Sequence, residues 1–254
     1  MTAFSEDRTS LTLKELAQKA GFDAATTLRY ARALSHAGFL ERRSDGRYSL
    51  GFEVLNLARI RISQLDVRAH ALPIMRRIRD QINETVSLNV RSGSYRVMVE
   101  QMEGLKEFRR TGGIGQHVPL HCGAASLVLL AFLPEKDIEE YLSSTTLRLL
   151  RDNTLIRRDK MRAALQQIRI RGYAESENER GEGGAGAAAP IYDHAGDVVA
   201  ALNIAAPLDG WRAAREEIRN CVVAGAAEIS NSLGYGLVSA AASGRSRRAR
   251  SRIP

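Results

Sequence analysis

The sequence predicts an α+β protein in two parts, a winged helix-turn-helix at the N-terminus followed by a domain built on an antiparallel sheet. Two short amphipathic helices, separated by a glycine turn, precede a glycine hairpin within the first 51 residues. Hairpins and helices are mixed along the rest of the chain. A length of 254 residues gives room for about two domains.

The first helix is expected between Thr12 and Gly21. Its apolar residues recur at helical spacing on one face. Thr12 and Glu15 have the spacing of a capping box, and Gly21 suits the left-handed position that often ends a helix. A longer helix usually opens such a domain. Because only ten residues precede Leu11, we expect that opening helix to be truncated and its core to be less well covered.

The second helix is expected over residues 24–34, with Asp23 as its cap. An apolar stripe lies opposite a polar and basic face. The first residues of a recognition helix reach base edges in the major groove, and arginine is the usual reader of guanine. The residues predicted to contact DNA from this helix are Ala25, Thr26, Thr27, Arg29, Tyr30 and Arg32.

A hairpin turn at residues 44–46 forms the expected wing, with arginines on both sides. Arg43 and Arg47 are predicted to hold phosphate or the minor groove. The alternative is a small structural unit with a solvated charged face. We favour DNA binding because two helices, their caps, the glycine turn and the hairpin agree in order and spacing.

Residues 52–66 read as a linker helix, and a further helix is expected at about 67–83, which Pro73 would bend or restart. Helical periodicity predicts more helices at about 123–133, from 135, at 158–171 and at about 211–233. Strands are predicted at 85–91, 95–101, 173–176, 187–192 and 198–205. The expected domains are therefore 1–51, the linker 52–66, 67–240, and a disordered basic tail over 241–254.

Composition indicates a cytoplasmic protein. The formal net charge is +8, of which +5 comes from the arginines of residues 244–254. The chain has two cysteines, Cys122 and Cys221, so no disulfide is expected. It has no signal peptide and no run of 18 apolar residues, so we expect no membrane partner.

A collinear set of short motifs resembles the IclR family of bacterial transcriptional regulators from Leu11 to about Leu237. The set comprises Gly46-Arg-Tyr-Ser-Leu-Gly51, Val118-Pro-Leu-His121, Leu130-Ala-Phe-Leu133, Gly172-Tyr-Ala174, Glu179, Gly183, Ala188-Ala-Pro190 and Val198-Val-Ala-Ala-Leu202. The resemblance implies a GAF-like effector domain after the linker helix. It also implies a homodimer or tetramer on double-stranded DNA with a palindromic operator, and a small-molecule effector, with carboxylates and aromatic acids as first candidates.

By position, the resemblance implies an effector site lined by Ala124, Ala125, Ser126, Ser176, Gly186 and Asn203. Independently of the family, a helix beginning within 122–126 would offer free N–H groups to an anion. The hydroxyl and amide groups would be polar partners, and small residues would leave volume for a ligand. Alternatively, the small residues only permit close packing. Ser126-Leu127 stands where relatives commonly have Gly-Lys, so the effector's identity does not transfer.

Three further patterns resemble cofactor, metal or catalytic sites, but the surrounding sequence argues against each. The glycines at 181, 183 and 186 match a dinucleotide fingerprint, but a strand and not a helix follows, so a flexible loop beside the effector site is expected. His117, His121 and Cys122 could bind a metal, but Pro119 breaks the helix that their spacing requires. The acidic residues Glu175, Glu177, Glu179 and Glu182 are expected to be solvated. We therefore expect no metal, cofactor or catalytic residues.

The favoured function is a ligand-responsive transcriptional regulator, with repression favoured over activation. An alternative is a metabolite-binding enzyme with an accessory winged helix. A third hypothesis is a ligand-free C-terminal domain that serves only for dimerisation.

Overall fold

The computed structural model describes residues 3–5, 7–63, 66–147, 157–179 and 182–236. The chain divides into two compact units, Met1–Leu65 and Asp66–Pro254, which we describe separately. The tail predicted to be disordered, 241–254, lies outside the described residues.

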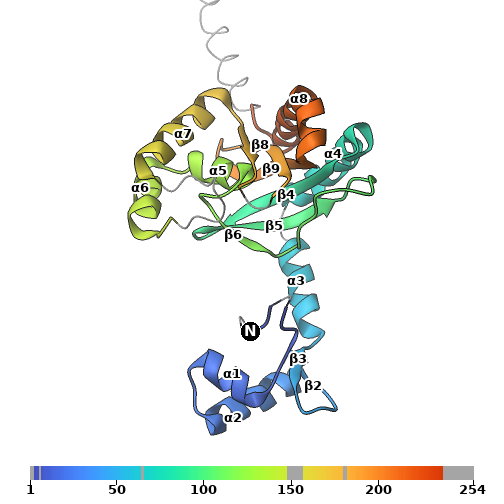
Figure 1. The fold of residues 1–254 in the computed structure, drawn as a ribbon, viewed down its shortest axis with the longest axis vertical. Helices are drawn as coiled ribbons and strands as arrows, with labels where there is room; N and C mark the ends of the chain where they lie inside the picture. The colour runs from blue at the N-terminus through green and yellow to red at the C-terminus, as the bar shows by residue number, and fades with distance from the viewer. Residues whose placement is uncertain (1–2, 6, 64–65, 148–156, 180–181, 237–254) are drawn as a thin grey trace, which may run out of the picture. The chain divides into compact units, whose positions relative to one another are not determined.

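The first unit is a winged helix-turn-helix. Helices α1 (Leu13–Ala20) and α2 (Ala24–His36) precede the hairpin of β2 (Leu40–Arg42) and β3 (Tyr48–Leu50), and α3 (Glu53–Ser63) follows (Figure 1). Strand β1 (Ser10–Leu11) pairs with the other edge of β3, so the antiparallel order is β1-β3-β2. The core of this unit consists of Leu11, Leu16, Ala31, Leu40 and Tyr48.

The caps predicted for α1 and α2 are confirmed. The Glu15 N–H donates to Thr12 Oγ1 (3.2 Å), and the Thr12 N–H donates back to the Glu15 carboxylate (2.7 Å). Gly21 has a φ of +70° and ends α1 in the left-handed region. Asp23 caps α2 by accepting a hydrogen bond from the Thr26 N–H (2.9 Å).

The truncated opening helix is not observed. Of the described residues before β1, none is helical. A turn replaces the helix and packs Ala3 and Phe4 against the core, and Lys19 Nζ holds it by donating to the Ala3 carbonyl (2.5 Å). The core is thus covered by two apolar side chains, where a helix would supply several.

The second unit is built on a six-stranded antiparallel sheet of order β6-β5-β4-β9-β8-β7. The strands are β4 (Thr85–Ser92), β5 (Tyr95–Met102), β6 (His117–Pro119), β7 (Ala174–Glu177), β8 (Gly184–Tyr192) and β9 (Val198–Pro207). β4 and β9 form the centre of the sheet, and each belongs to one of the two predicted hairpins.

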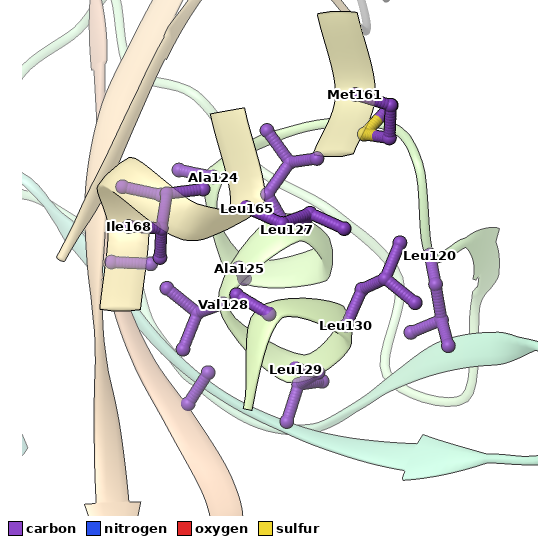
Figure 2. Close-up of a cluster of buried hydrophobic side chains, with 14 of the residues drawn as sticks. Leu120, Ala124, Ala125, Leu127, Val128, Leu129, Leu130, Met161, Leu165 and Ile168 are labelled. Carbon is purple, nitrogen blue, oxygen red and sulfur yellow. The ribbon is translucent and has the colours of Figure 1, made fainter. Parts of the chain in front are cut away.

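Helices cover both faces of this sheet (Figure 1). One face carries α4 (Asp66–Ile82) and α8 (Leu208–Ser232), and the other carries α5 (Ala124–Ala131), α6 (Glu135–Ser144) and α7 (Arg158–Arg171). Figure 2 shows α5 with side chains of α7 packed around it. All eight residues of α5 are buried, as expected for a helix that is apolar all round.

Two details differ from the sequence-based expectation. Pro73 neither ends nor restarts α4, which is assigned as one helix over 17 residues. Strand β8 begins at Gly184, three residues earlier than predicted, so Gly184 and Gly186 lie in a strand and the flexible loop predicted there is wrong for these two residues. Glycine has low strand propensity, so composition concealed the start of this strand.

Candidate functional site

The first candidate surface is the outer face of α2. Ala25, Arg29, Tyr30 and Arg32 are exposed, and Thr26 is half-buried. The Arg29 guanidinium carbon lies 5.5 Å from the centre of the Tyr30 ring, and that ring lies 5.6 Å from the ring of Phe22. This face therefore presents two arginines and an aromatic ring beside the N-terminal turn of the helix.

Thr27 does not belong to this outer face, contrary to the prediction. It is only 5% exposed, and its hydroxyl donates to the Asp23 carbonyl (2.8 Å). Thr27, Ala31 and Leu34 are spaced by four and three residues, so they share one face of the helix. Thr27 therefore belongs to the packed stripe, where its polar group is satisfied locally.

The two wing arginines that were predicted to contact DNA have different surroundings. Arg43 is exposed beside the turn. Arg47 instead turns toward its own domain: Nε donates to Ser10 Oγ (3.3 Å), Nη2 donates to the Ser10 carbonyl (3.1 Å), and Nη2 lies 3.4 Å from the Glu15 carboxylate. Arg47 therefore fastens the wing to β1 and to the cap of α1, whereas the sequence predicted that it holds phosphate or the minor groove.

The second candidate site lies on the face of the sheet that α5 covers. Strand pairing places Ser176 opposite Gly186, and Asn203 opposite both Ala188 and Ser87. The Ala124 N–H, at the start of α5, donates to Ser176 Oγ (3.1 Å). Asn203 Nδ2 donates to Ser87 Oγ (3.2 Å). The structure thus brings the start of α5, Ser176 and the central strands of the sheet to the same face.

Glu179 is a member of this site that sequence reasoning missed. Its carboxylate accepts a hydrogen bond from the Gly123 N–H (2.8 Å), and its carbonyl accepts one from the Cys122 thiol (3.4 Å). Burial raises the pKa of Glu179 to about 7, although the bond from Gly123 acts in the opposite direction. The prediction that Glu179 is solvated is wrong, and the start of α5 already receives a carboxylate of the chain.

The small residues of the site have packing roles. Ala124 and Ala125 are buried in the cluster of Figure 2. A Cβ at Gly186 would lie 2.4 Å from the Ile204 carbonyl oxygen. The close pairing of β8 with β9 therefore explains the glycine without any ligand. Ser126 is fully buried, and its hydroxyl has no hydrogen-bond partner among the residues described. Ser126, Ser176 and Asn203 are therefore the predicted residues with polar groups to offer.

Glu175, Glu177 and His121 also have structural partners, so the prediction that Glu175 and Glu177 are solvated is wrong as well. Glu175 pairs with Arg215 (2.5 Å), and Glu177 accepts a hydrogen bond from the Trp211 indole (2.8 Å). His121 is buried, with Nδ1 2.8 Å from the Tyr141 hydroxyl. Within the described ranges, no three His, Cys, Asp or Glu side chains are grouped closely enough to hold a metal ion. Nor is any described helix both long and apolar enough to cross a bilayer.

Two family models match the chain. The model for the IclR helix-turn-helix domain matches residues 1–44, and the model for the bacterial transcriptional regulator IclR C-terminal domain matches residues 60–231.

Curated relatives agree with this match. The HTH-type transcriptional regulator KipR of Bacillus subtilis is 32% identical over 89% of this chain and 91% of its own length. The HTH-type transcriptional repressor AllR of Escherichia coli is also 32% identical, over 72% of this chain and 68% of its own.

Solved structures have the same fold. The IclR of Thermotoga maritima is 29% identical, with a TM-score of 0.72 over 89% of this chain and 92% of that chain. An IclR homolog from Microbacterium hydrocarbonoxydans, complexed with 4-hydroxybenzoate, is 26% identical, with a TM-score of 0.80 over 91% and 95% of the two chains.

Proposed function

Because the chain belongs to the IclR family of bacterial transcriptional regulators, we propose that its C-terminal unit binds a small-molecule effector and that this binding changes its affinity for operator DNA. The observation that carries the DNA half of the proposal is the exposed face of α2. Its residues 25 and 26 and Arg29, Tyr30 and Arg32 enter the major groove, and Arg43 holds phosphate at the wing.

The DNA target is a palindrome bound by a homodimer or a tetramer. Apolar side chains at the start of α3 and beside it support this assembly: Phe52 is 77% exposed, Leu55 64% and Leu57 48%. Such side chains are usually covered when they gather on one short segment. A second copy of the winged domain would cover them and present two recognition helices to two half-sites.

Regulation follows from linkage. An effector that binds two arrangements of the dimer with different affinity shifts the population between them. The shift reaches DNA by way of α3, after which the chain continues to α4 and the effector unit. Repression is the favoured output, since one relative is named a repressor. Carboxylates and aromatic acids are the first probes, since 4-hydroxybenzoate is bound in one structural neighbour.

One observation supports a second candidate, a C-terminal unit that dimerises without a ligand. Glu179 already satisfies the Gly123 N–H that an anionic effector would use. Both hypotheses predict DNA binding, but only the effector hypothesis predicts a response to small molecules.

The proposal is tested with the full chain in two steps. Selection from a random duplex pool should enrich a palindrome, and a metabolite panel should contain a compound that raises the melting temperature and changes affinity for that palindrome. A palindrome without any responding compound would favour the ligand-free hypothesis.

A further inference from the structure

Arg110 lies in the loop of residues 103–116, between β5 and β6, and its head group reaches β8. Its Nη1 donates to the Glu182 carbonyl (3.3 Å). A Cβ built on Gly184 would lie 2.7 Å from both Nε and Nη2 of Arg110. The guanidinium therefore rests against the backbone of β8 at Gly184, and a side chain at that position would displace it.

The face of β8 that Arg110 covers is the face of the candidate effector site. Alternate residues of a strand point to the same side, so Gly184, Gly186 and Ala188 share one face. Ala188 packs in the cluster around α5. Two residues of a strand span about 6.6 Å. The Arg110 guanidinium at Gly184 therefore lies two residues along the strand from Gly186, and Gly186 pairs with Ser176.

The charge of Arg110 is not compensated by a carboxylate of the described chain. The only hydrogen bond of its guanidinium among the described residues is to the neutral carbonyl of Glu182. The adjacent Arg109 is paired with Glu103 (2.8 Å). A half-buried guanidinium has five N–H donors in a planar fork, which fits a carboxylate with two parallel hydrogen bonds.

The start of α5 does not offer a second place for an acid. The Glu179 carboxylate already accepts the hydrogen bond of the Gly123 N–H, so that donor is not available to a second carboxylate. The uncharged donors and acceptors lie further along the strands, since Ser176 pairs with Gly186 and Asn203 pairs with Ala188, one and two pleats from Gly184. An acid would therefore bind with its carboxylate at Arg110 and its uncharged part toward those two residues.

We propose that Arg110 is the specificity-determining residue of the effector site and that it selects an organic carboxylate. This inference rests on the proposed effector function. Charge-assisted hydrogen bonds predict that removing the guanidinium weakens binding of the acid by roughly 10- to 150-fold. Binding of an uncharged analogue should change little.

The test uses the full chain and its Arg110→Gln variant, with Arg109→Gln as the matched control on the same loop. The acids are benzoate, 4-hydroxybenzoate, pyruvate and gluconate, and the uncharged probes are benzamide and 4-hydroxybenzamide. A melting screen finds the best acid, and titration calorimetry gives its affinity. We expect an acid to bind the wild type and the Arg109→Gln variant equally, and the Arg110→Gln variant at least tenfold more weakly.

A second variant, Gly184→Ala, displaces the guanidinium without removing its charge, and it should also weaken the acid. Equal binding of the acid by the Arg110→Gln variant overturns the assignment, and so does a site that binds the amides but none of the acids. If neither acids nor amides bind, the proposed effector function fails together with the assignment. Amide binding alone refutes only the role of Arg110.

Discussion

Replacing Glu179 by glutamine should remove a pH dependence from the stability of the second unit. In the folded chain, burial raises the pKa of Glu179 to about 7 from an ordinary value of 4.5. The folded state therefore binds the proton more tightly than the unfolded state. The contribution of this group to the free energy of unfolding is fully present below pH 4.5, and it is lost as the pH rises through 7.

The magnitude follows from the two pKa values. Since one pKa unit corresponds to about 1.4 kcal/mol, raising the pH from 5.5 to 8 should cost the wild type about 2 kcal/mol through this group. Glutamine stays uncharged and can still accept the hydrogen bond from the Gly123 N–H. The stability of the Glu179→Gln variant relative to the wild type should therefore increase by about that amount over the same range.

The chain contains one tryptophan, Trp211, which is fully buried in the second unit and reports its unfolding. Urea unfolding followed by tryptophan fluorescence at pH 5.5, 6.5 and 8 gives the three free energies. Glu182→Gln is the matched control, because Glu182 is exposed on the same loop. A stability difference between the Glu179→Gln variant and the wild type that stays constant from pH 5.5 to 8 would refute the reasoning.

Four other substitutions give distinct outcomes. Gly186→Ala should lower stability by roughly 1–3 kcal/mol, because its Cβ would lie 2.4 Å from a backbone carbonyl oxygen; an unchanged urea midpoint would contradict this packing role. Arg43→Gln should lower the slope of log affinity for DNA against log salt by about 0.9, as expected for one lost phosphate contact. Arg47→Gln should leave that slope unchanged but lower the melting temperature of the first unit, because its partners are Ser10 and Glu15. Asn203→Leu should abolish the response to the effector without changing DNA affinity, and calorimetry with unchanged effector affinity would remove Asn203 from the site.

The fold was predictable where local signals repeat. The capping box at Thr12 and Glu15, the left-handed Gly21 and the Asp23 cap all act within four residues, and α7 was predicted from its periodicity with both ends correct. The start of β8 was missed because alanine and glycine give neither an alternating pattern nor strand propensity.

The candidate site was less predictable because its contacts connect distant parts of the chain. Glu179 meets Gly123 across 56 residues, and Arg110 meets Glu182 across 72. No spacing rule covers such pairs. Arg47 was assigned to DNA from its place beside the turn, but its contact with Ser10 depends on how β1 pairs with β3. Thr27 could have been placed correctly, since its spacing from Ala31 and Leu34 already marks the buried stripe.

The central claim is that α2 reads DNA through its exposed arginines. The most direct measurement uses fluorescence anisotropy to determine the affinity of the Arg29→Ala variant for the duplex that the wild type selects. Arg157→Ala is the control, because Arg157 is an exposed arginine of the second unit and is paired with Asp159. We predict a loss of about 1–3 kcal/mol, or roughly 5- to 150-fold in affinity, with an unchanged melting temperature. A variant that binds the selected duplex as tightly as the wild type would contradict the claim.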